Sequence, residues 1–163
     1  MMKGKPLARV ALLALLVLLL GLKVEPQPFI DLICQGDAYQ SRKEYSAASG
    51  AYRQAALLKP SSALPFLRLG QTYLAQRRYE LAGEAFGQAY RLGAREQALV
   101  GLGAVYAGLG HKERAIEYWH QALALNPKDV AVRYRLGRLY LCLLYTSDAA
   151  DDLLCVDLGG RRI

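Results

Sequence analysis

The 163-residue sequence contains few of the residues that build disulfide frameworks and metal centres: it has three cysteines and two histidines. Three cysteines are too few for a disulfide scaffold, and no C-x-x-C pair or Cys/His cluster has the spacing of zinc ligands. The histidines, His111 and His120, have no nearby pair of carboxylates with ligand spacing. We therefore expect no metal, no other cofactor and no catalytic residues in this chain.

Acidic residues are also scarce, with 14 Asp and Glu against 21 Lys and Arg, and the net charge is +7. A content of 53% hydrophobic residues excludes a disordered tail, because such tails cannot bury enough apolar surface to fold. The basic excess alone is compatible with nucleic acid, an anionic membrane or no specific partner. Because no nucleic-acid recognition motif accompanies it, we expect no nucleic-acid partner.

The most apolar segment is the first one. Within residues 1–24, three basic residues precede an uninterrupted apolar run from Val10 to Leu22, as in an export signal. This run would rise roughly 20 Å as a helix, less than the ~30 Å hydrocarbon core, so its length does not separate an anchor from a cleaved signal peptide. We interpret residues 1–24 as an N-terminal membrane helix, followed by a Pro-rich linker at 25–28. The basic flank predicts a single-pass membrane protein with the remaining chain outside the cytoplasm; secretion after cleavage, and a cytosolic protein with an apolar N-terminus, are the alternatives.

Four glycines recur at intervals of 33 or 34 residues, and other residues follow them at fixed distances. A tyrosine comes three residues after each glycine. In the first three units an alanine follows at twelve residues, an aromatic residue at sixteen and a second alanine at nineteen. We expect these residues to pack the units together: Gly36, Tyr39, Ala48, Tyr52 and Ala55; Gly70, Tyr73, Ala82, Phe86 and Ala89; Gly103, Tyr106, Ala115, Trp119 and Ala122; Gly137 and Tyr140. The joint recurrence predicts an array in which each unit buries its apolar face against its neighbours.

This pattern resembles that of the tetratricopeptide repeat (TPR) family over residues 29–141. The resemblance implies an all-α solenoid of antiparallel helix pairs, with units at 29–62, 63–95 and 96–129 and the first helix of a fourth unit at 130–141. We expect helices at residues 30–42, 44–58, 63–75, 78–92, 96–109, 111–125 and 129–141. The last helix lacks the second helix of its unit, so we expect its apolar face, including Leu136, Leu139 and Tyr140, to be partly exposed or covered by the residues that follow Leu141.

Residues 142–163 differ abruptly in character from the helical sequence before them. Residues 142–151 resemble the translation of a transposase-type sequencing-library adaptor, and residues 156–163 resemble the flow-cell end of the same adaptor. We interpret residues 142–163 as adaptor-derived and expect the natural protein to continue differently after Leu141. A longer protein, including an enzyme with its catalytic domain beyond this point, therefore stays open as an alternative.

In TPR proteins the first helix of each unit lines a concave groove. Carried over to this chain, the groove positions are mostly apolar or small: Ile33, Asp37 and Gln40; Leu67, Gln71 and Leu74; Val100, Ala104 and Ala107; Tyr134 and Arg138. The cluster of Lys, Arg and Asn with which some TPR proteins grip a C-terminal carboxylate is missing. The resemblance thus implies a non-catalytic scaffold for protein–protein interaction, whose groove suits an amphipathic helix or an extended peptide.

Overall fold

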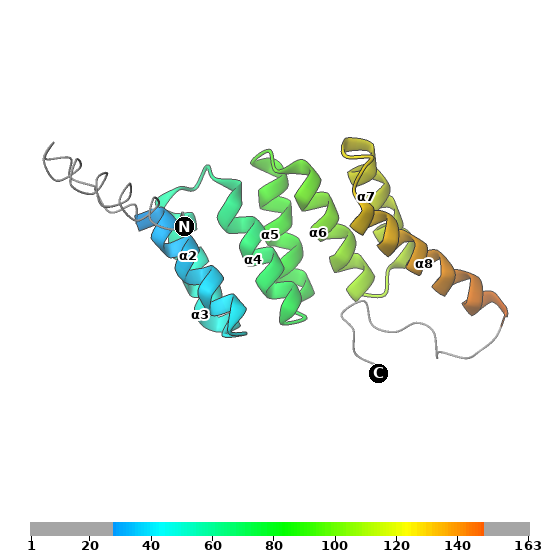
Figure 1. Cartoon of the computed structure of the whole chain (residues 1–163), viewed down its shortest axis with the longest axis horizontal. Coiled ribbons are helices and arrows are strands. Elements are labelled where there is room, and N and C mark those ends of the chain that lie inside the picture. The colour runs from blue at the N-terminus through cyan, green and yellow to red at the C-terminus, as the bar shows by residue number, and fades with distance from the viewer. Residues whose placement is uncertain (1–27, 149–163) are drawn as a thin grey trace, which may run out of the picture.

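The computed structural model describes residues 28–148, which form seven α-helices arranged in one row (Figure 1). The helices are α2 (Pro28–Ser41), α3 (Tyr45–Leu58), α4 (Ala63–Ala75), α5 (Tyr79–Arg91), α6 (Arg95–Gly108), α7 (Lys112–Leu125) and α8 (Val130–Asp148). Each helix packs against the next one along the chain, and α4 also contacts α6 directly. This is the all-α solenoid of helix pairs that the repeat pattern predicts.

The helix boundaries follow the sequence closely except at the end of the described residues. The first six helices begin and end within two residues of the expected positions, and α4 matches at both ends. In contrast, α8 continues to Asp148, seven residues beyond the expected end at Leu141. The residues that follow Leu141 contain no glycine or proline before Asp148, so nothing in them interrupts the backbone hydrogen bonds of the helix. The origin of residues 142–163 stays a prediction.

The turn between the two helices of a unit has the same geometry in all three units. The backbone N–H that starts the second helix donates to the carbonyl of the repeat tyrosine at 2.9 Å in each case. The residue seven positions after the repeat glycine has a positive φ: 62° at Lys43, 58° at Arg77 and 81° at Gly110. Two of these residues carry a side chain in the left-handed region, where L-residues are disfavoured.

Within each of the first three units, the repeat glycine lies against the aromatic ring sixteen residues later. A Cβ added to Gly36, Gly70 or Gly103 would approach the ring of Tyr52, Phe86 or Trp119 to 2.4, 2.7 and 2.3 Å, respectively. These rings are at most 2% exposed, and the alanines twelve and nineteen residues after each glycine are at most 1% exposed. The glycines therefore make room for rings that form the centre of each unit, a more specific role than close approach of two helix backbones.

The fourth glycine and its tyrosine are different. An added Cβ at Gly137 would meet no described atom within 4 Å, and Tyr140 is 47% exposed. Our expectation for Leu136 and Leu139 is wrong, because both are at most 5% exposed and pack with Ala115 and Trp119 of α7. One face of α8 thus covers α7, and Tyr140 lies at the edge of this contact, with its hydroxyl 2.9 Å from Nε2 of His120 on α7.

The structure contradicts the predicted localisation. Among the described residues no helix is both long and apolar enough to cross a membrane, so the single-pass membrane protein with extracytoplasmic repeats is withdrawn. The apolar segment at 1–24, from which that localisation was argued, lies outside the described residues, as do the linker residues before Pro28.

Candidate functional site

The predicted groove residues come from α2, α4, α6 and α8, the first helices of their units, and we call the surface they share the first-helix face. Gln71 and Tyr134 are exposed on it, whereas most of the others are half-buried. Ile33 is the exception: it is only 7% exposed and packs in a core cluster with Ala48 and Tyr52. Its side chain belongs to the core, so we remove Ile33 from the candidate site.

A polar cluster ties α2 to α4 at one end of the first-helix face. The Tyr52 hydroxyl lies 2.6 Å from Asp37 Oδ1 and 3.0 Å from Gln40 Oε1, so its proton is shared between two acceptors. Burial, and then the Asp37 carboxylate, raise the pKa of Tyr52 well above its ordinary value, so the hydroxyl stays a donor. Two predicted groove residues, Asp37 and Gln40, are thereby held in fixed positions.

Two residues of this cluster were not foreseen from the sequence. Arg68 Nε lies 3.3 Å from Asp37 Oδ1, and its Nη1 donates to Gln71 Oε1 at 3.3 Å. The buried Thr72 donates its hydroxyl proton to the Arg68 carbonyl of its own helix at 2.8 Å, and Gln40 Oε1 lies 3.4 Å from the same hydroxyl oxygen. The spacing of Arg68 and Gln71 on one helical turn was the available signal, but no sequence pattern pairs Arg68 with a carboxylate of the preceding unit.

The apolar positions of the first-helix face also support the fold. Leu67 and Leu74 pack against a cluster of Ala82, Phe86 and Val105. The α6 residues at predicted groove positions pack in the same way against a cluster formed by α7 and α8; they are Val100, Ala104 and Ala107. At the far end, Tyr134 is 65% exposed, with the Arg138 guanidinium 5.8 Å from its ring centroid. The face therefore offers a partner the outer parts of side chains whose inner parts hold the helices together.

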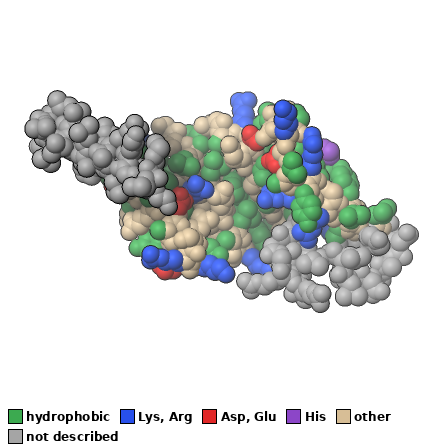
Figure 2. All heavy atoms as spheres, in the orientation of Figure 1, with side chains coloured by type: hydrophobic (Ala, Val, Ile, Leu, Met, Phe, Trp, Pro, Cys, Tyr) green, Lys and Arg blue, Asp and Glu red, His purple; other side chains and the backbone are tan. Residues whose placement is uncertain are grey.

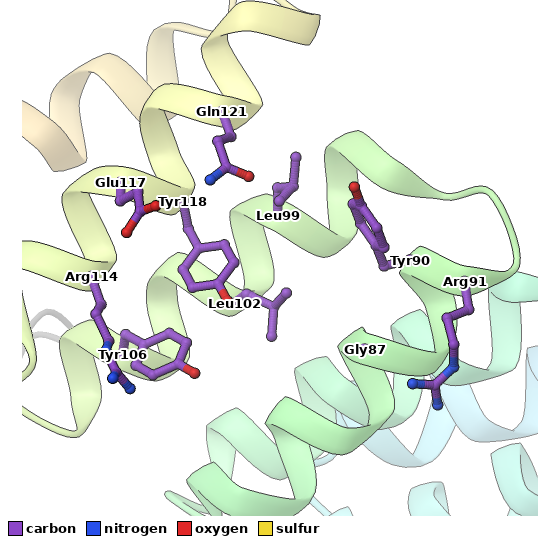
Figure 3. Close-up of a pocket in the computed structure, with 10 residues that line it drawn as sticks. All are labelled: Gly87, Tyr90, Arg91, Leu99, Leu102, Tyr106, Arg114, Glu117, Tyr118 and Gln121. Carbon is purple, nitrogen blue, oxygen red and sulfur yellow. The ribbon is translucent and has the colours of Figure 1, made fainter.

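A cavity of about 460 Å³ lies on another side of the solenoid, between α5 and α7 and over α6 (Figure 3). The α6 residues that line it are Leu99, Leu102 and Tyr106. The predicted groove residues of α6 are one or two positions further along the helix and therefore lie on a different face of it. The other lining residues are Gly87, Tyr90 and Arg91 of α5, and Arg114, Glu117, Tyr118 and Gln121 of α7. Of the ten, the sequence had singled out only Tyr106, and then for packing.

Aromatic and basic side chains dominate the inside of this cavity. The rings of Tyr106 and Tyr118 stack at 5.1 Å between centroids and 7° between planes, and the Arg114 guanidinium lies 5.6 Å from the centroid of Tyr106. Burial, followed by the neighbouring Tyr106, raises the pKa of Tyr118, so the Tyr118 ring stays neutral at physiological pH. Figure 2 shows that basic side chains are spread over the visible face of the solenoid and that acidic ones are few.

No group of three or more His, Cys, Asp or Glu side chains in the described part of the chain could hold a metal ion. The two surfaces present hydrogen-bonding groups, apolar side chains and charged side chains.

Comparison with known proteins gives the same repeats. Family models described as tetratricopeptide repeat match residues 35–98 and 96–129. Protein bimA of Emericella nidulans is 26% identical over 98 residues, which are 60% of this chain and 12% of that protein. The photosystem I assembly protein Ycf3 of Acaryochloris marina is 33% identical over 63 residues, 39% of this chain and 36% of that protein. The chain thus spans well under two thirds of the length of either relative.

Among solved structures, the second TPR domain of the human RPAP3 protein, in complex with the HSP70 peptide SGPTIEEVD, superposes with a TM-score of 0.65. It is 21% identical, and the match covers 69% of this chain and 95% of that domain. At this identity the likeness shows the fold alone. The two family matches together cover residues 35–129, more than half of the sequence, so the chain belongs to the tetratricopeptide repeat family.

Proposed function

We propose that this chain is a protein-interaction scaffold that binds a peptide or helix of a partner on its first-helix face and catalyses no reaction itself. The observation that carries the proposal is the composition of this face, which is polar where α2 meets α4, apolar along α6, and carries Tyr134 and Arg138 on α8. The polar cluster around Asp37, Gln40 and Arg68 joins α2 to α4, and α4 in turn contacts α6, which carries Ala104 and Ala107. Fixed polar groups beside an apolar strip suit an amphipathic peptide.

The polar cluster also bears on the kind of peptide. Arg68 is the cation of this cluster, and its guanidinium is already engaged by the Asp37 carboxylate and the Gln71 amide. A partner's carboxylate would have to approach Arg68 beside the Asp37 carboxylate, which already neutralises its charge and would repel a second anion. We therefore do not propose that the first-helix face binds an acidic peptide such as the HSP70 peptide in the RPAP3 complex. We propose a ligand whose contacts with this face are mainly apolar.

The scaffold that we propose comprises the units at 29–62, 63–95 and 96–129 and the helix that begins at 130. We infer that residues 142–163 are adaptor-derived and form no part of it. Sequencing the source DNA tests this inference, because native genomic sequence through the codons for these residues would contradict it.

A blocked first-helix face tests the function. Peptides that bind the full chain are first selected from a displayed library, and their affinities are then measured for the Gln71→Trp variant. Gln71 is exposed on α4, so a larger side chain leaves the core intact while covering the face. We expect affinity to fall at least about tenfold, or ~1.4 kcal/mol.

The matched control is Gln54→Trp, which places the same side chain at an exposed position of α3, a second helix. It should leave affinity unchanged. Equal effects of the two variants, or a library that yields no binding peptide, would count against the proposal.

A further inference from the structure

The cavity between α5 and α7 is shaped by residues that depart from the repeat pattern. On α7, Arg114 and Tyr118 supply a cation and a ring to its wall. Their counterparts, eleven and fifteen residues after the repeat glycine, are small or aliphatic in the other two units: Ala47 and Leu81, and Ala51 and Ala85. Stacking of the units does not require an arginine or a tyrosine at these positions.

The α5 wall departs from the pattern in the same region. Gly87 lines the cavity, and a Cβ there would meet nothing within 4 Å, whereas the counterparts in the other units are Arg53 and His120. Tyr90 is 40% exposed beside it, where the other units carry Ala56 and Leu123. The missing side chain at Gly87 leaves the space, and the ring of Tyr90 bounds it.

The charges on this lining point to an anionic ligand. Arg114 and Arg91 lie on opposite sides of the cavity (Figure 3), and neither forms an ion pair within the described residues. Arg91 donates to the Gln88 side chain, and Arg114 lies over the face of Tyr106. Glu117 is the acidic residue of the lining, so two positive charges face one negative charge. Guanidinium groups in such positions pair well with carboxylates.

We propose that this cavity is a second binding site, for an acidic segment of a partner protein that inserts an aromatic side chain. The floor at Leu99 and Leu102 is apolar, and Tyr90, Tyr106 and Tyr118 provide ring faces and edges for an inserted ring. About 460 Å³ is room for one large side chain with part of its backbone. Carboxylates on both sides of the inserted residue then reach the two guanidinium groups.

Titration calorimetry on the full chain tests the chemistry directly. The probe is a synthetic peptide, capped at both ends, with one phenylalanine between two pairs of glutamates. One comparison peptide carries lysine in place of the glutamates, and a second carries alanine in place of the phenylalanine. We expect saturable binding of the probe below about 1 mM and at least tenfold weaker binding of both comparison peptides. Absence of binding, or equal binding of the lysine peptide, would overturn the proposal.

Variants then locate the site. Gly87→Leu fills the cavity, and Gly50→Leu is its control, because the Cβ at each of these helical glycines meets open space. Arg114→Ala removes one cation at a position where the first unit carries alanine. We expect tenfold weaker binding for Gly87→Leu and Arg114→Ala, unchanged binding for Gly50→Leu, and unchanged circular dichroism for all three. Wild-type affinity of Gly87→Leu would overturn the assignment.

A further variant separates this site from the first-helix face. Gln71→Trp should leave binding of the acidic probe unchanged, because Gln71 does not line the cavity. If Gln71→Trp instead abolishes it, the acidic peptide binds on the first-helix face and the second site does not exist. Failure of library peptides on the first-helix face would leave the calorimetric result standing.

Discussion

Replacing Gly103 by alanine probes the contact at the centre of the third unit. The added Cβ would lie 2.3 Å from Nε1 and 2.4 Å from Cδ1 of Trp119, far inside the ~3.5–4.0 Å of a favourable contact. The ring is fully buried, and its N–H donates to the Val100 carbonyl at 3.1 Å, so it cannot shift without losing that hydrogen bond. Overpacking costs about 1–3 kcal/mol and the lost bond about 1 kcal/mol, whereas helix propensity favours alanine by about 1 kcal/mol. We expect a net loss of about 2 kcal/mol.

Urea unfolding followed by fluorescence is the assay, because Trp119 is the only tryptophan and reports on the third unit. Gly50→Ala, in the middle of α3, and Gly137→Ala, at the same repeat position as Gly103, are the controls. Both added methyl groups would meet nothing within 4 Å among the described residues, so helix propensity alone acts and each should stabilise by up to about 1 kcal/mol. Similar effects of Gly103→Ala and Gly50→Ala would refute the argument from ring contact.

Two further predictions concern the turns and the polar cluster. Lys43→Gly should raise the free energy of unfolding by about 1 kcal/mol, because it relieves a side chain at φ 62°; a urea midpoint at or below that of the wild type would contradict this. The pKa of Tyr52 is raised in the folded state above its ordinary 10.0, so its contribution to stability is complete below pH 10 and is lost as pH rises toward the folded value. Tyr52→Phe should lose about 1–2 kcal/mol at neutral pH with the bonds to Asp37 and Gln40, yet decline less steeply than the wild type above pH 10. Equal alkaline slopes in urea titrations at several pH values would show that Tyr52 does not control this loss.

The helix pairs could be predicted because the recurring residues are those on which stacking depends. A ring that fills the centre of a unit needs a glycine opposite it. A glycine and an aromatic residue therefore recur sixteen residues apart in each of the first three units, as Gly70 and Phe86 do in the second. The shared turn geometry could not be predicted in the same way. Lys43 and Arg77 occupy a left-handed position that glycine normally marks, so composition gives no signal there.

The candidate surfaces were less predictable for two physical reasons. A helix inside a solenoid is apolar over a wide arc, so position alone did not show that Ile33 faces the core and that Leu74 is half-buried. The contacts of Arg68 depend on the register between neighbouring units, which brings a carboxylate 31 positions earlier in the chain to within 3.3 Å. The same limit applied to Leu136, because only the packed structure shows which face of α8 lies on α7.

The exposure of a repeat position limits what a mutation there can show about binding. The repeat alanines and the repeat aromatic residue, such as Ala82 and Phe86 in the second unit, are at most 2% exposed, so a change at any of them alters stability before it alters recognition. Substitutions at positions that differ between units should affect stability less, because another unit of the same solenoid already carries a different residue there. Tyr118→Ala places on α7 the residue that both other units carry at that position, which removes a wall of the cavity while keeping an accepted side chain. In such an array, exchanging residues between units therefore separates effects on binding from effects on folding more cleanly than truncating side chains at buried repeat positions.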